Sequence, residues 1–173
     1  MPIVLNGTTG NISGSSLTGI DTGKILQVKQ AVKTDTFTSS ASTADITGLS
    51  VNITPSASTS KIFIIAAVNT MASNVGCTYR INGTANGDIG MGAADGSRTR
   101  GNVGDLYEAY NSPFVTHTSC FLDSPNTTNQ QTYKVVSVSA AGATMQVNRG
   151  NTDTDTSSKI RGASSITVME IAA

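Results

Sequence analysis

The segment Lys61–Val68, KIFIIAAV, constrains the fold more than any other stretch of this sequence. It holds seven consecutive apolar residues in a chain that is only 38% hydrophobic. Such a run is too short to span a bilayer, and Ile62, Ile64 and Ile65 are β-branched, which favours a strand over a helix. We therefore predict a central strand of a two-layer β structure, with both of its faces covered.

The composition is typical of one all-β body. A chain of 173 residues has the size of a single domain with a real core. Serine and threonine make up about a quarter of it, which disfavours long helices and suits short strands joined by tight turns. Lysine and arginine (11) balance aspartate and glutamate (11), so the net charge is zero. We expect neither nucleic acid as a partner nor insertion into a membrane.

Apolar alternation from residue 24 onward predicts about eight strands. Leu26, Val28 and Val32 alternate with Gln27, Lys29 and Lys33, which is the period of a sheet with one solvent-facing side, and this strand can continue as a bent second piece through Phe37. Leu49, Val51 and Ile53 form another strand that Pro55 stops, because proline cannot donate to a ladder. Further strands are expected over residues 77–82, 113–123, 132–139, 143–149 and 165–171. The pattern indicates an antiparallel sandwich or jelly roll.

Residues 1–23 are predicted to form an extended arm, and residues 24–173 the sandwich. The arm is rich in glycine, serine and threonine and should not fold alone. We expect it to dock on a neighbouring chain; the alternative is that it folds back on its own domain. Its start, MPIVLNGTTG, lacks the basic region of a signal peptide, so we expect synthesis in a cytoplasm. The candidate docking residues are Ile3, Val4, Leu5, Ile12, Leu17 and Ile20.

The segment after the Cys77 strand is the least sheet-like part of the sequence. Asn82-Gly83 and Asn86-Gly87 favour a hairpin turn, and one of them should be a hairpin tip. Residues 90–104 are glycine-rich and polar, and residues 106–110 could form a turn or two of helix. Long insertions on a rigid scaffold often bind ligands. The candidate residues facing a receptor or glycan are Arg98, Arg100, Asn102, Tyr107 and Tyr110, although the tyrosines could equally pack between subunits.

Motifs for catalysis are weak in this sequence. His117 is the only histidine and Ser119 follows it by two residues, but no G-x-S-x-G elbow is present. Cys77 and Cys120 lack metal or redox spacing, and we expect both to be buried free thiols. We therefore expect a protein without catalytic activity or cofactor.

A calcium loop is only partly matched. Asn151, Asp153 and Asp155 copy the spacing of its first ligands, yet Thr156 stands where the loop needs glycine and Gly162 where it needs glutamate. We expect no metal site.

Several blocks of the sequence resemble a known family. They are GKILQVKQ from residue 23, TGLSVNITPSASTSKIFI from residue 47, FLDSPNTTNQQTYKV from residue 121, VNRGNTDTDTS from residue 147 and RGASSITVMEIAA from residue 161. Together they are similar to the C-terminal domain of many bacteriophage and marine-virus structural proteins, often labelled tail fibre proteins. The opening MPIVLNGTTG also resembles the start of such fibres, but the repetitive shaft of the longer members is almost absent here.

This resemblance implies a virion surface protein built as a homotrimer of compact β-sandwiches. The expected function is a non-enzymatic knob or short fibre of the tail, docked through its N-terminal arm, with host attachment as a further role. The expected partners are further copies of itself, other proteins of the tail or capsid and, for attachment, a host surface glycan. Two alternatives stay open: a capsid decoration protein that acts as cement or head fibre, and a free carbohydrate-binding module.

Overall fold

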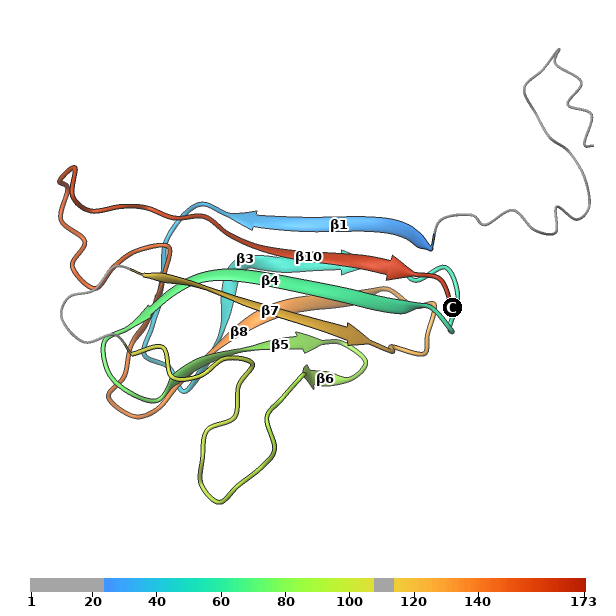
Figure 1. The fold of residues 1–173 in the computed structure, drawn as a ribbon, viewed down its shortest axis with the longest axis horizontal. Coiled ribbons are helices and arrows are strands. Elements are labelled where there is room, and N and C mark those ends of the chain that lie inside the picture. The colour runs from blue at the N-terminus through green and yellow to red at the C-terminus, as the bar shows by residue number, and fades with distance from the viewer. Residues whose placement is uncertain (1–23, 108–113) are drawn as a thin grey trace, which may run out of the picture.

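The computed structural model describes residues 24–107 and 114–173, which form two antiparallel sheets packed face to face (Figure 1). The predicted arm, residues 1–23, lies outside the described residues. The described part of the chain contains strands and no helix. The strands are β1 (Ile25–Lys33), β2 (Phe37–Ser39), β3 (Thr43–Ile53), β4 (Lys61–Ala72), β5 (Cys77–Gly83), β6 (Gly87–Ile89), β7 (Val115–Asp123), β8 (Gln131–Ser139), β9 (Met145–Val147) and β10 (Ser164–Ile171).

The strand order is that of a jelly roll. In the first sheet β10 lies between β1 and β4, and β7 pairs with the other edge of β4. Strands β9 and β2 continue this sheet, since β9 pairs with the end of β4 and β2 pairs with β9. The second sheet has the order β3-β8-β5-β6. Most connections cross from one sheet to the other, as in two Greek keys. The predicted antiparallel sandwich is confirmed. Strand β2 lies in line with β1, and β9 lies in line with β10, so each of these two pairs occupies one position in the strand order.

The KIFIIAAV segment is the central strand of the first sheet. Strand β4 pairs with β10 on one side and with β7 on the other, as predicted. Ile62, Ile64, Ala66 and Val68 face the second sheet and are fully buried among side chains of β3, β5 and β8. Burial of each large aliphatic side chain contributes about 1.5–3 kcal/mol, so this row is a main source of stability.

The opposite face of β4 is different. Phe63, Ile65 and Ala67 point away from the core and are only partly buried. The two sheets are the only layers in the described part of the chain, so no third layer covers these side chains. The prediction that both faces of the strand are covered is therefore wrong for the described protomer.

Two turn predictions are confirmed. Strand β3 ends at Ile53, two residues before Pro55. Strands β5 and β6 form a hairpin in which Asn86-Gly87 closes the turn, and Gly87 has φ +67°, a conformation that favours glycine.

Strand β1 is turned the other way from the sequence-based expectation. Its polar side faces the second sheet, and Lys33 is buried there, with its stem against Gly48 and its Nζ atom 2.8 Å from Asp35 Oδ1. The pKa of Asp35 is lowered by this hydrogen bond. The apolar side, with Val28 and Val32 exposed by 53% and 55%, faces outward. A lysine can be buried in this way because its ammonium group is paired with the carboxylate of Asp35.

Glu170 is a buried carboxylate that fixes the β3–β4 connection to β10. Gln27 Nε2 donates to its Oε2 atom at 2.6 Å, while the backbone N and the Oγ of Ser56 each donate to Oε1 at 2.6 Å. Burial alone would raise the pKa of Glu170, but the hydrogen bonds from Gln27, Ser56 and Ser60 outweigh it and lower the pKa to about 2. The carboxylate is therefore ionised and fully paired in the folded protein.

A second buried acid connects the two sheets. Asp123, at the end of β7, accepts hydrogen bonds from Tyr133 Oη on β8 and from Asn86 Nδ2 in the β5–β6 turn, both at 2.7 Å. Burial, and next the Asp123 carboxylate, raise the pKa of Tyr133, so its hydroxyl stays protonated as the donor. The contact fixes the β5–β6 hairpin to the first sheet.

Glu170→Gln is expected to lower the free energy of unfolding by about 1–3 kcal/mol at neutral pH, because an amide cannot accept all of these hydrogen bonds. In the wild type, ionised Glu170 contributes stability that is present above pH 4.5, the ordinary pKa of the group, and that is lost as the pH falls towards 2. Chemical denaturation of both proteins between pH 7 and pH 3 measures this, and the difference between them should narrow below pH 4.5.

Asp95→Asn is the matched control. Asp95 forms an exposed ion pair with Arg98, and its loss should cost less than about 0.5 kcal/mol. A difference between wild type and Glu170→Gln that stays constant down to pH 3 would contradict the assigned role of Glu170.

Candidate functional site

Residues 90–107 leave the end of β6 as an irregular loop that projects from the second sheet (Figure 1). Gly90 allows this exit, since it has φ +65° and a Cβ atom there would lie 2.3 Å from the ring of Phe121. The predicted irregular insertion over residues 90–104 is confirmed. Leu106 and Tyr107 are not helical, and residues 108–110 of the expected helical turn lie outside the described residues.

The returning part of this loop runs beside β5. Asn102 N donates to Tyr79 O at 2.9 Å, and Leu106 N donates to Cys77 O at 3.0 Å. Leu106 also accepts a hydrogen bond from Ala72 N and is buried in the core. The loop is therefore held at its base as an additional edge segment of the second sheet.

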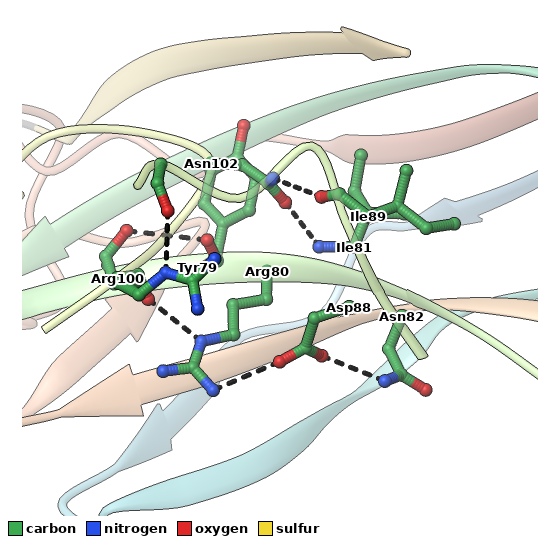
Figure 2. Close-up of polar contacts among 10 residues, drawn as sticks. Tyr79, Arg80, Ile81, Asn82, Asp88, Ile89, Arg100 and Asn102 are labelled. Atoms are coloured by element: carbon green, nitrogen blue, oxygen red, sulfur yellow. Dashed lines mark hydrogen bonds and ion pairs between the residues drawn. The ribbon is translucent and has the colours of Figure 1, made fainter. Parts of the chain in front are cut away.

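Asn102 is the anchor of the loop, as Figure 2 shows. Its Oδ1 atom accepts a hydrogen bond from Ile81 N, and its Nδ2 atom donates to Ile89 O at 2.6 Å and to Gly90 O at 3.1 Å. These contacts join β5, β6 and the loop at one point. The side chain is used within the fold, so it does not present its amide to a receptor as we expected.

Arg100 holds the outgoing part of the loop, with its Nε atom 2.6 Å from Gly92 O. Arg80 on β5 donates to Arg100 O at 2.9 Å and pairs with Asp88 at 3.2 Å, and Asn82 donates to the same carboxylate (Figure 2). The solvent-facing side of the second sheet therefore carries a network of cations and amides beside the loop. Such groups can bind hydroxyl and carboxylate oxygens.

The remaining candidates lie further apart. Arg98 pairs with Asp95, and both side chains are exposed. Tyr107 lies at the other end of the returning segment and is 43% exposed. Tyr110 is outside the described residues. The structure therefore leaves Arg98, Arg100 and Tyr107 as exposed members of the predicted receptor-facing set.

A hollow of ≈ 320 Å³ lies between the loop and the start of β5, and Arg98, Val103 and Asp105 line it. Asp105 is turned towards the backbone, where it accepts hydrogen bonds from Gly76 N at 2.8 Å and Tyr107 N at 3.2 Å. Cys77 also borders the hollow. Burial raises the pKa of the Cys77 thiol, Ser139 partly offsets this and Asp105 adds to it, so the thiol stays neutral.

The side chains of Ser119 and Asp153, from the other motifs considered in the sequence, form hydrogen bonds or ion pairs within the sandwich. Ser119 is buried and its Oγ atom lies 2.9 Å from the hydroxyl of Tyr79, whose pKa burial raises to about 12. Asp153 pairs with Arg149 at 3.4 Å and with Arg161 at 2.8 Å, so its carboxylate braces the β9–β10 loop. In residues 24–107 and 114–173 no group of three or more histidine, cysteine, aspartate or glutamate side chains could hold a metal ion.

A second candidate surface, which we did not predict from the sequence, is the outward side of the first sheet. Residues opposite each other in an antiparallel ladder point to the same face. The register aligns Val28 with Met169, Met169 with Phe63, and Phe63 with Leu122, which gives an apolar row across four strands. We call this surface the outer face; its apolar members are Ile25, Val28, Val32, Phe63, Ile65, Ala67, Cys120, Leu122, Met169 and Ile171.

The outer face is exposed in the protomer. Leu122 is 59% exposed, and Cys120 is an exposed free thiol, so the expectation that both cysteines are buried holds only for Cys77. The signal for this surface was in the sequence. A central strand that is apolar on both sides, in a chain with only enough strands for two layers, must have one apolar side outward.

A comparison with protein-family models and with curated proteins finds no match for this chain. Across the described residues, no helix has the length and hydropathy to cross a membrane.

Asn102→Ala is expected to free the base of the loop and to make Arg98 and Arg100 several times more sensitive to limited cleavage by trypsin, because three hydrogen bonds to the backbone are lost. Mass spectrometry of the fragments measures this. Asn129→Ala, at an exposed position between β7 and β8, should leave the cleavage rate unchanged. Equal cleavage rates in the wild type and in Asn102→Ala would contradict the anchoring role.

Proposed function

We propose that this protein is a non-enzymatic structural component of a bacteriophage virion, a homotrimeric knob or short fibre of the tail that docks through residues 1–23. Host attachment through the exposed loop is a further part of this proposal. Decoration of the capsid, as cement or head fibre, is the alternative location for the same kind of module.

The observation that carries this proposal is the outer face. A protein that works alone seldom leaves a broad, mostly apolar surface in water, whereas an assembly component buries such a surface against a partner. Val28, Val32 and Leu122 are each more than half exposed, on strands that are otherwise well paired. The sequence blocks that resemble phage structural proteins support a virion as the kind of assembly.

The fold agrees with this proposal without selecting it. Jelly rolls occur in viral capsid domains and in lectins alike, so the fold by itself leaves structural and sugar-binding functions open. The buried acids Glu170 and Asp123 and the anchor Asn102 each hold a connection in place. Such a rigid body suits a particle component.

Deletion of residues 1–23 is expected to leave a folded oligomer that no longer enters particles, because the arm supplies the docking contact and the sandwich supplies the fold. Circular dichroism and sedimentation check the fold and the assembly, and immunoblotting of purified particles checks incorporation. Loss of folding on this deletion would instead make residues 1–23 part of the core. Deleted protein that still enters particles would contradict docking through the arm.

The copy number per particle separates the two locations. Quantitative mass spectrometry of intact particles should find a few trimers for a tail component and many tens for a protein that decorates the shell. Absence of the protein from purified particles would overturn the proposed function.

The attachment role depends on the exposed loop. Arg98→Ala combined with Tyr107→Ala should reduce binding of the isolated protein to host cells or to a glycan array, because both side chains are exposed on the loop and Arg98 also lines the hollow. Lys159→Ala, an exposed cation on the β9–β10 loop, is the control and should bind as wild type does. Unchanged binding by the double variant would remove this loop from the attachment role.

A further inference from the structure

We propose that the outer face is the surface through which copies of this chain pack against one another. This inference rests on the proposed function, in which the protein works as an assembly, and it adds the contact that holds the assembly together. Val28, Met169, Phe63 and Leu122 stand side by side from one edge of the first sheet to the other.

The outer face has the extent of the principal apolar patch of many proteins. Strands lie about 4.8 Å apart and residues rise about 3.3 Å along a strand, so four strands over seven residues cover on the order of 400 Å², with polar side chains such as Gln30 and Thr167 among the apolar ones. An apolar patch of this order is often a functional surface. The apolar side of β1 extends the face to the edge of the sheet, where Val28 and Val32 are free of contact with the core.

The charge of the outer face favours a second copy as its occupant. Among the side chains that the register places on this face, only Lys61 is charged; it lies at the end of its row and donates to Ser124 Oγ at 2.9 Å. Nucleic acid or an anionic membrane would need a basic surface. A neutral apolar face can pack against the same face of another copy. In the proposed homotrimer the three faces would turn towards the three-fold axis, and one part of each face would contact a different part of the next.

Residues 1–23 are the other cover that the chain itself could supply. They join the body at Lys24, close to the start of β1. An extended segment is only one strand wide, however, whereas the outer face is four strands wide. The arm also has few large apolar residues, and these are separated by glycine, serine and threonine. It could cover one row of the face and would leave the others in water, so we assign the face to another copy.

Analytical ultracentrifugation of the full chain tests this inference. We expect the wild type to sediment as an oligomer, and Leu122→Asp and Val28→Asp, at opposite edges of the face, each to sediment with the mass of one chain. Both positions are exposed in the protomer, so the strand signal in circular dichroism should be retained. Ile160→Asp makes the same change at a residue that is 69% exposed on the β9–β10 loop, and this control should remain an oligomer.

Cys120 gives a second measurement that needs no destabilising variant. Its thiol is exposed in the protomer, whereas Cys77 is buried within it. Alkylation of Cys120 should be slow in the assembled wild type and severalfold faster in Val28→Asp, in which the substitution lies three strands away. Fast alkylation of Cys120 in a wild-type oligomer would show that the copies meet elsewhere and would overturn the inference.

The remaining outcomes decide between this inference, coverage of the face by residues 1–23, and failure of the proposed function. A wild-type chain that sediments as a monomer, or face variants that stay oligomeric, would overturn the inference. If deletion of residues 1–23 turns a monomer into an oligomer, the arm covers the face instead. A monomer that still enters particles would leave the proposed function intact, whereas an oligomer that depends on Leu122 but is absent from particles would overturn the function and keep the interface.

Discussion

The structure depends on a central strand that is apolar on both of its sides. Each side needs an apolar neighbour, and a two-layer sandwich provides only one. The inward side of β4 meets β3, β5 and β8 and forms the middle of the core. The outward side, with Phe63 and Ile65, remains accessible to a partner. Folding of the protomer therefore satisfies half of this requirement, and the contact between copies proposed above would satisfy the rest.

Polar contacts then give the sandwich a fixed shape. Glu170 ties the β3–β4 connection to β10, Asp123 ties a hairpin of the second sheet to the first, and Asn102 ties the long loop to β5. In each case one side chain satisfies more than one hydrogen-bonding group at the base of a connection. The loops of a jelly roll would otherwise be its most variable part. Here Asn102 fixes the base of the long loop, and the outer portion of that loop stays exposed.

Much of the fold was predictable from the sequence because alternation, Pro55 and Asn86-Gly87 act locally. The direction in which a strand faces is not a local property. Strand β1 reads as an amphipathic strand in either orientation, and the prediction placed its apolar side inward, whereas the structure places Lys33 inward. The role of Asn102 was equally hidden, since an exposed amide and an anchoring amide have the same sequence. Only the register between distant strands brings Val28, Phe63 and Leu122 into one row.

The position of Lys24 has a mechanical consequence. It marks the start of β1 and accepts a hydrogen bond from Ala172 N at 2.7 Å, so the point where residues 1–23 join the body lies beside the C-terminus (Figure 1). Tension entering at Lys24 along β1 would pull this strand lengthwise past β10. The hydrogen bonds of an antiparallel ladder run across the strands, so such a pull would shear all the pairs from Ile25 to Lys33 at once instead of peeling them apart one by one. A sandwich tethered at this point would resist a pulling force better than one held by the tip of a hairpin.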